Sequence, residues 1–287
     1  MHPQNIHIEN YDFDSLSQKH SELSEHVFIN DYGNKSIDFS NSESVLQLNM
    51  ALLRLHYGIE GYELPKGYLC PAIPGRVDYI HYIADLLSEE NKTENIKGLD
   101  IGTGANCIYP ILATQTYDWR MVGCDIDKFA VDAAKNNVSL TKALKDKIEI
   151  RHQSNNANIF EGIINVNEKF DFTMCNPPFH TSEKEALSAT KQKMKNLKSE
   201  VYDPNLKSNF SGQANELWCN GGESLFIKRM IKQSVAFKDQ VGWFTSLVSK
   251  KENLSKLKKQ LDKLKAEHRI VEMEIGNKKT RFIAWKF

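Results

Sequence analysis

The residues with the clearest chemical potential are Asn176-Pro177-Pro178-Phe179, which directly follow an apolar run. The amino group of an aromatic base or an amide is a poor nucleophile, because its lone pair is delocalised into the π-system. The Asn176 side-chain oxygen and the Pro177 carbonyl can each accept one N–H and so orient that lone pair. The prolines stiffen the turn, and Phe179 can stack on a flat substrate. The motif predicts a site that presents a planar amine; alone, it could also be a plain proline-rich turn.

A second motif, Asp100-Ile101-Gly102-Thr103-Gly104, ends one apolar run and opens a predicted helix. Two glycines let the backbone turn sharply and approach a ligand without Cβ clashes. Asp125 ends the next predicted strand, where a carboxylate can accept both hydroxyls of a ribose. A tight turn would explain Gly-x-Gly by itself, and the pairing with Asp125 also fits an NAD site.

The kind of cofactor is narrowed by two departures from phosphate-binding motifs. Cys107 occupies the third glycine position of Gly-x-Gly-x-x-Gly, and the chain has no Gly-Lys-Ser/Thr loop. These departures favour a cofactor with adenosine but no phosphate, of which S-adenosylmethionine is the common one. Its sulfonium is already activated, so catalysis rests mainly on proximity and alignment, with no metal required. The two motifs together predict a methyltransferase that acts on a planar amino nitrogen.

Short apolar strands alternate with helices from residue 96 onward, which predicts a parallel, doubly wound α/β sheet. By analogy, the order matches the Rossmann-like methyltransferase fold, a mostly parallel seven-stranded sheet with a C-terminal antiparallel hairpin around Gly276-Asn277. The predicted strands are 96–101, 121–125, 147–151, 170–175, 241–248, 270–275 and 280–287. The predicted helices are 77–87, 106–114, 129–138, 224–235 and 254–264.

Residues 1–70 are polar and rich in His and Asn, with one helical repeat of Val45, Leu48, Leu52 and Leu55. We expect them to form a small N-terminal module that recognises RNA, followed by a catalytic domain over 71–287. Residues 181–220 interrupt the strand–helix rhythm and are rich in Lys, Ser and Asn. They are predicted to be an insertion or mobile loop near the site.

The bulk composition bounds the class of protein. The 287 residues have a formal net charge of zero, and no apolar run reaches membrane-spanning length. The five cysteines show no CxxC spacing, so neither a disulfide framework nor a zinc site is indicated. A cytoplasmic monomer without a membrane anchor is expected. Lysines cluster in 184–198 and 250–265, where they form either phosphate-binding patches or solvated helix faces.

Further segments resemble one family, the ribosomal RNA large subunit methyltransferase F family, which is related to the eukaryotic methyltransferase-like protein that modifies U6 small nuclear RNA. The matching catalytic segments are Pro71–Arg76, Tyr79–His81, Asp100–Cys107, Met174–Phe179 and Gly221–Glu223. The matching N-terminal segments are His2-Pro3, Tyr11–Phe13, Tyr32-Gly33, Ser36–Phe39 and Gly67–Cys70. The resemblance covers nearly the whole chain.

This resemblance implies methylation of the exocyclic N6 amino group of one adenosine in 23S ribosomal RNA, either free or in a pre-ribosomal large-subunit particle. Arg76 would pair with the methionine carboxylate of the cofactor, and Gly102 would touch the cofactor. Asp125 would bind the ribose, and Gln153 and Asn155 would lie near the adenine. The other positions implied are Asp100, Thr103 and Gly104 for the cofactor, Asn176 for both cofactor and amine, and Pro177, Pro178 and Phe179 for the acceptor.

Three alternatives stay open from the sequence. A protein glutamine N-methyltransferase shares Asn-Pro-Pro, and the target adenosine could belong to another structured RNA. Transfer of a labelled methyl group, followed by RNase or protease, would show which polymer is modified. An RNA-binding protein that keeps the fold without catalysis is the third alternative, and a cofactor titration tests it.

Overall fold

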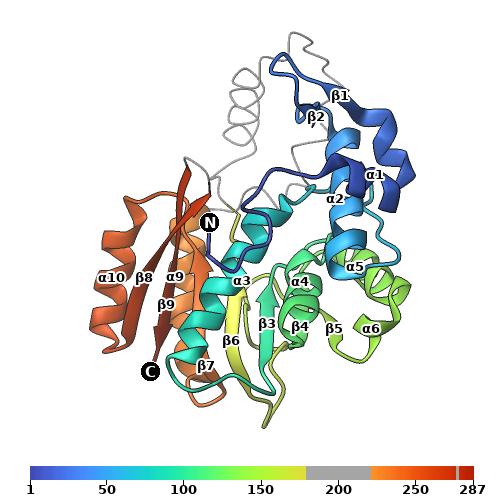
Figure 1. Ribbon diagram of the computed structural model, residues 1–287. Helices are drawn as coiled ribbons and strands as arrows, with labels where there is room; N and C mark the ends of the chain where they lie inside the picture. The colour runs from blue at the N-terminus through green and yellow to red at the C-terminus, as the bar shows by residue number, and fades with distance from the viewer. Residues whose placement is uncertain (179–220, 276–277) are drawn as a thin grey trace.

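The central sheet contains the seven predicted strands in the order β5-β4-β3-β6-β7-β9-β8 (Figure 1). The computed structural model describes residues 1–178, 221–275 and 278–287. Neighbouring strands from β5 to β7 pair in parallel, whereas β9 is antiparallel to both β7 and β8. The predicted parallel sheet with a C-terminal antiparallel hairpin is therefore confirmed. The strands are β3 Lys97–Ile101, β4 Arg120–Asp125, β5 Ile148–His152, β6 Phe170–Cys175, β7 Val241–Leu247, β8 Glu267–Ile275 and β9 Lys278–Lys286.

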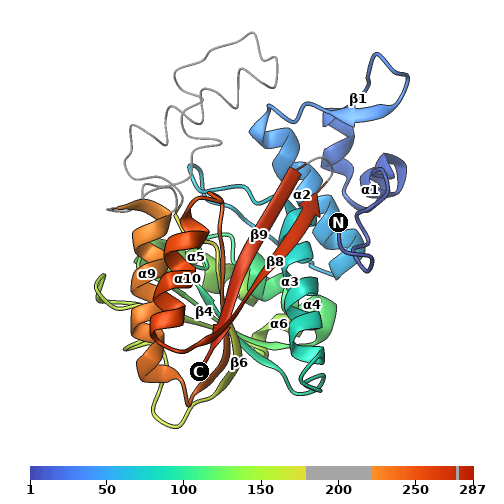
Figure 2. The same ribbon diagram turned by 90° about the vertical axis from the view of Figure 1, so that its left-hand side faces the viewer.

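Helices cover both faces of the sheet, and alternate residues along a strand feed two apolar cores. In β9, Phe282 and Ala284 pack in the core shared with α3 and α4, whereas Ile283 and Trp285 pack in the core shared with α9 and α10. Figure 2 shows these two helix layers on opposite sides of β8 and β9. The helices are α3 Ile73–Ser88, α4 Ile108–Tyr117, α5 Lys128–Leu140, α6 Lys142–Lys145, α9 Gly222–Ser234, η3 Val235–Phe237 and α10 Asn253–Lys263.

The N-terminal region folds into α2 and a group of shorter elements that pack beside α3 and α4. The leucine repeat correctly predicted α2, Ser42–Tyr57, which ends at Gly58 in the left-handed conformation. The shorter elements are α1 Phe13–Lys19, η1 Ser21–His26, β1 Val27–Ile29 and β2 Lys35–Ile37. Leu16 and Leu53 belong to the same apolar core as α3 and α4, and the division of the chain at residue 70 stays a prediction.

Two sequence predictions fall on residues outside the described ranges. These are the loop or insertion at 181–220, which contains the first lysine cluster, and the turn at Gly276-Asn277. Among the described residues, no helix is long and apolar enough to cross a membrane.

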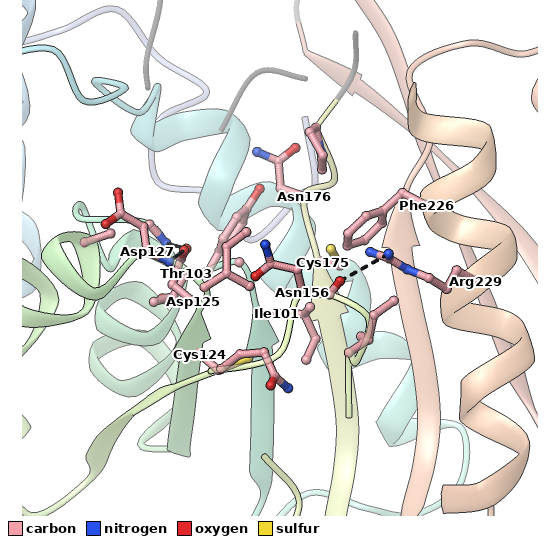
Figure 3. Close-up of a pocket in the computed structure, with 18 of the residues that line it drawn as sticks. Ile101, Thr103, Cys124, Asp125, Asp127, Asn156, Cys175, Asn176, Phe226 and Arg229 are labelled. Carbon is pink, nitrogen blue, oxygen red and sulfur yellow. Dashed lines mark hydrogen bonds between the residues drawn. The ribbon is translucent and has the colours of Figure 1, made fainter. Parts of the chain in front are cut away.

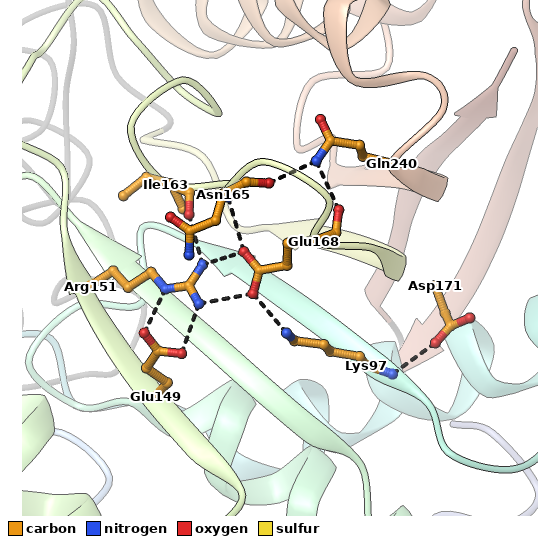
Figure 4. A network of polar contacts seen from close by, with 8 residues as sticks. All are labelled: Lys97, Glu149, Arg151, Ile163, Asn165, Glu168, Asp171 and Gln240. Carbon is orange, nitrogen blue, oxygen red and sulfur yellow. Dashed lines mark hydrogen bonds and ion pairs between the residues drawn. The ribbon is translucent and has the colours of Figure 1, made fainter.

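A network of ion pairs attaches the long connection between β5 and β6 to the sheet (Figure 4). Arg151 lies 2.7 Å from both Glu149 and Glu168, and Lys97 lies 2.7 Å from Glu168. Burial would raise the pKa of Glu168, but hydrogen bonds from Arg151 and Lys97 lower it to about 2. The network fixes a segment whose first residues, from Gln153 onward, line a cavity at the carboxyl ends of the strands.

Candidate active site

The glycine motif forms the turn between β3 and α4. Gly102 and Gly104 both have positive φ, +75° and +62°, a conformation that residues with a Cβ rarely adopt. The amides of Gly102 and Thr103 each donate to the Cys124 carbonyl at 2.9 Å, which ties this turn to the end of β4. A Cβ on Gly102 would meet no atom of the described residues within 4 Å. The turn therefore leaves open space directly over its backbone.

Asp125 ends β4 beside this turn. One of its carboxylate oxygens accepts the Gly104 amide and the other accepts the Asp127 amide, each at 2.9 Å. Burial raises the pKa of Asp125, and these backbone hydrogen bonds oppose that rise. Because a carboxylate oxygen has two lone pairs, both oxygens keep acceptor capacity for hydroxyl groups. Asp127 in turn accepts the Tyr68 hydroxyl at 2.7 Å and caps α5 through the Phe129 amide.

A cavity of about 810 Å³, here called the sheet-edge cavity, lies over these residues. Its size falls within the range of about 300–1,000 Å³ typical of small-molecule sites. Figure 3 shows Asp125 and Asp127 on one side, Phe226 and Arg229 on the other, and Asn176 between them at the end of β6. The predicted site residues that line it are Arg76, Gly102, Thr103, Gly104, Asp125, Gln153, Asn176 and Pro178.

Asp100 is placed differently from the rest of its motif. Its side chain is 1% exposed and is not among the residues that line the sheet-edge cavity. Neither carboxylate oxygen has a hydrogen-bond partner of good geometry among the described residues, although the Thr103 side chain lies nearby. Burial raises the pKa of Asp100 to about 7; the Thr103 side chain opposes this rise and the nearby charge of Asp125 reinforces it. The residue lies beneath the turn, and its predicted contact with the cofactor stays a prediction.

The segment after β5 reaches the cavity through other residues than Asn155. Gln153 lines the cavity, and its side chain donates to the Glu161 carbonyl at 2.9 Å and accepts the Asn155 amide at 3.0 Å. The Asn155 side chain accepts the Ala157 amide at 3.0 Å and is not among the lining residues described. Asn156, Asn158 and Ile159 line the cavity instead.

Asn176 occupies the first position after β6, and its side-chain oxygen is buried without a partner among the described residues. Pro177 is buried, and Pro178 lines the sheet-edge cavity. The predicted stacking residue Phe179 lies outside the described residues. A buried unpaired oxygen costs stability, so this atom is a marker of a site that binds a hydrogen-bond donor.

A second cavity of about 1250 Å³, here called the outer cavity, opens on the other side of Asn176. Arg76 and Asn176 line both cavities and so form a shared wall. The hydroxyl of Tyr109 accepts a hydrogen bond from Arg76 Nη1 at 2.8 Å, and the guanidinium lies 5.3 Å from the centre of the Tyr109 ring. The remaining lining residues described lie within 72–75 and at both ends of the chain, within 1–39 and 247–281.

The N-terminal wall of the outer cavity is attached to α3. The backbone N–H of His2 and the side-chain amide of Asn5 both donate to one oxygen of Asp78, at 2.7 and 2.9 Å. Asn5 also donates to the Pro74 carbonyl at 3.0 Å, one turn before Asp78. His7 pairs with the Tyr57 hydroxyl at 2.7 Å, and burial lowers its pKa to about 4. These contacts give His2 and Asn5 a structural role, because they attach the N-terminal residues to α3.

Comparison with known proteins decides the family. Residues 1–287 match the model of a family described as RNA methyltransferase. The chain belongs to this RNA methyltransferase family. It is 58% identical to ribosomal RNA large subunit methyltransferase F of Christiangramia forsetii, with all of both chains aligned. It is 46% identical to the protein of that name from Pseudoalteromonas translucida, over 100% of this chain and 93% of the relative.

Solved structures agree with this assignment as an RNA methyltransferase. The catalytic domain of human METTL16 in complex with MAT2A 3′UTR hairpin 1 superposes with a TM-score of 0.84 and 30% identity, over 100% of this chain and 95% of that one. The N-terminal domain of human METTL16 in complex with SAH gives 0.78 and 28%, over 100% and 98%. The predicted family and the predicted Rossmann-like methyltransferase fold are thus confirmed.

Sequence reasoning missed the contribution of α9 to this RNA methyltransferase. Phe226 and Arg229 line the sheet-edge cavity, together with Lys228 and Lys232. Arg229 lies over the Phe226 ring at 5.5 Å and donates to the Asn156 carbonyl at 3.3 Å. The one sequence signal nearby was Gly221-Gly222-Glu223 at the start of α9, which gave no indication of which helix face meets the cavity.

Proposed function

We propose that this chain transfers the methyl group of S-adenosylmethionine to the exocyclic N6 amino group of an adenosine in 23S ribosomal RNA. The observation that carries the proposal is the side-chain oxygen of Asn176. It is buried without a partner among the residues that the structure describes, and it lies on the wall shared by the two cavities. The names of the relatives support ribosomal RNA as the substrate, and human METTL16 structures with an RNA hairpin and with SAH support the two ligand classes.

The sheet-edge cavity fits S-adenosylmethionine. The open space over Gly102 admits a ligand against the backbone, and Asp125 keeps acceptor capacity for two ribose hydroxyls. Arg76, held against Tyr109 on the shared wall, matches a carboxylate. The bound cofactor supplies an activated methyl group at this wall. The role of the protein is to bind the cofactor and fix its position.

The outer cavity would hold the adenosine that accepts the methyl group. The Asn176 oxygen accepts one N–H of the adenine amino group, and the Pro177 carbonyl accepts the other. Asn176 does not ionise, so it orients the amine without removing a proton. The methylated nitrogen must lose one proton as the cofactor loses its methyl group, and that proton would pass to water. The two hydrogen bonds would point the lone pair of the amine toward the methyl group of the cofactor. Alignment, rather than acid–base catalysis, would then supply most of the rate gain. An adenosine inside a helix cannot reach this position, so the nucleotide must leave its stack.

Residues 1–70 take part in RNA recognition under this proposal, with 71–287 as the catalytic domain. The N-terminal residues that line the outer cavity fall within 1–39, a range that contributes no described residue to the sheet-edge cavity. A substrate bound there approaches Asn176 without displacing the cofactor.

The deciding experiment maps N6-methyladenosine by mass spectrometry in 23S ribosomal RNA from cells with and without the gene. We expect one modified adenosine to be lost in the deletion strain and restored by the wild-type gene but not by Asn176→Ala. Purified protein with labelled cofactor, followed by RNase or protease, separates RNA from protein acceptors. Label that survives RNase but not protease would replace the proposal with glutamine methylation.

A further inference from the structure

The β1–β2 hairpin projects from the N-terminal region (Figure 1). Several of its apolar side chains are exposed. The exposed fractions are 48% for Phe28, 61% for Ile29 and 89% for Tyr32. Successive residues of a strand point to opposite faces, so Phe28 and Ile29 leave both faces of β1 uncovered. Apolar side chains grouped on a protruding element mark an interaction surface.

The turn of this hairpin holds Tyr32 in a fixed position. The Asn30 side-chain oxygen accepts the amides of Tyr32 and Asn34, each at 3.0 Å. The Asn30 and Gly33 amides add backbone bonds to the Asn34 and Asn30 carbonyls, each at 2.9 Å, and Gly33 takes φ +77°. The backbone is therefore ordered before any partner arrives. A tyrosine ring has only two side-chain torsions, so it loses little entropy on binding.

The base of the hairpin borders the outer cavity, and the charge on the cavity walls is divided. Asn30, Asn34 and Ser36 line it on the hairpin side, close to the acidic residues Asp12 and Asp14. Four cationic side chains, Arg76, Lys250, Lys279 and Arg281, lie on the other wall. A further cationic residue, Lys35, lies on the hairpin side, where it is paired with Asp14. A nucleic acid in this cavity would place its phosphates along the cationic wall. Its bases would then face the hairpin.

We propose that Tyr32 stacks on an RNA base that flanks the target nucleotide, and that the β1–β2 hairpin is an RNA-docking element. The inference rests on the proposed function of the outer cavity and names a further substrate contact. When the target adenosine leaves its stack, a neighbouring base loses a partner. An exposed ring beside the cavity replaces that partner. Aromatic stacking accepts any base, because every base has a π-face, so Tyr32 contributes affinity rather than sequence choice.

The test measures RNA binding and methylation by Tyr32→Ala, with unmethylated 23S ribosomal RNA from the deletion strain as the probe. Loss of one stacked base corresponds to roughly a 5- to 150-fold rise in the RNA Kd. Tyr32→Phe and Tyr32→Trp keep a ring and should bind close to wild type. The cofactor Kd and the Tm should not change, since the ring is 89% exposed. The matched control is Val166→Ala, which truncates a 90%-exposed side chain in the connection that precedes β6, at the edge of the sheet away from Asn176.

Three results would overturn the inference. The first is unchanged RNA affinity in Tyr32→Ala. The second is an equal loss of RNA affinity in Tyr32→Phe, which would indicate a contact through the hydroxyl group. The third is a loss of affinity for ribosomal particles but not for naked RNA, which would indicate a protein partner. Failure of the proposed function can be distinguished from failure of this inference. Wild-type protein that binds the RNA but transfers no methyl group to it would refute the proposed function, and Tyr32 would still be tested by the binding data.

Discussion

Replacing Asn176 with alanine should separate activity from stability. Within the described part of the chain its side-chain oxygen is buried without a partner, and such an atom costs about 1–3 kcal/mol relative to a hydrogen-bonded one. The substitution removes this cost, while the small void that it leaves acts in the opposite direction. We therefore expect a Tm equal to or above that of the wild type, at roughly 2–4 °C per kcal/mol for a chain of this order of size.

The same substitution should almost abolish methyl transfer. Loss of one preorganised hydrogen-bond partner typically lowers kcat by about 10²–10³-fold, and Asn176 is proposed to hold the reacting amine itself. Cofactor affinity, measured by calorimetry, should change much less, because Gly102 and Asp125 are intact. Activity should be followed with labelled S-adenosylmethionine and unmethylated 23S ribosomal RNA.

Asn158→Ala is the matched control for this prediction. It removes the same amide group from another residue that lines the sheet-edge cavity but not the shared wall. Its kcat should stay close to that of the wild type. Wild-type kcat in Asn176→Ala would refute the amine-holding role. An equal loss in Asn158→Ala, or a Tm that falls together with activity, would show that truncation merely disturbs the fold.

Three further predictions concern the cofactor and the fold. Arg76→Ala should weaken S-adenosylmethionine binding by roughly 10- to 150-fold, as expected for a charged hydrogen bond of about 1.5–3 kcal/mol; unchanged affinity in calorimetry would remove Arg76 from the site. Glu168→Gln should cost about 1.5–3 kcal/mol near neutral pH in urea unfolding, because it removes charged hydrogen bonds to Arg151 and Lys97 while Arg151 keeps Glu149 as a partner. The pKa of Glu168 is lowered to about 2, so its stabilisation is present above about pH 4.5 and disappears as the pH falls toward 2; equal wild-type and variant stability at neutral pH would contradict this. Asp100 should give stability the opposite pH dependence, since burial raises its pKa to about 7. Wild-type stability should fall as the pH rises from about 4 to 7, by at most about 4 kcal/mol, and Asp100→Asn should lack that slope.

Strong periodicity explains most of what the sequence could predict of the fold. Strand β6 coincides with the predicted run 170–175, and the heptad-like leucines of α10 marked a helix correctly. The N-terminal elements were missed apart from α2, because β1 and β2 have three residues each and α1 has seven. Elements this short contain fewer than two full repeats of an apolar pattern, which is too few to establish a period. Their positions are set by packing against α2 and α3.

The sequence could predict the location of those site residues that belong to a chemical motif. Gly102, Asp125 and Asn176 each follow a strand at the same edge of the sheet, and all three line the sheet-edge cavity. Asn155 shows the limit of such reasoning. In a loop without periodicity, a neighbouring amide is equally plausible from the sequence, and the structure brings Asn156 to the cavity. The part of α9 at Arg229 could not be predicted, because its contact with the loop depends on three-dimensional packing.

The walls of the outer cavity have a consequence for folding of the protein. They combine residues within 1–39 with residues 273 and 279–281, which lie far apart along the chain. Contacts between distant parts of a chain form late, because a long loop must close before they can stabilise the structure. Strands β3 and β4 can pair early in folding, but the outer cavity is completed only when β9 joins the sheet. The cavity that we propose for RNA is therefore among the last parts of the fold to form.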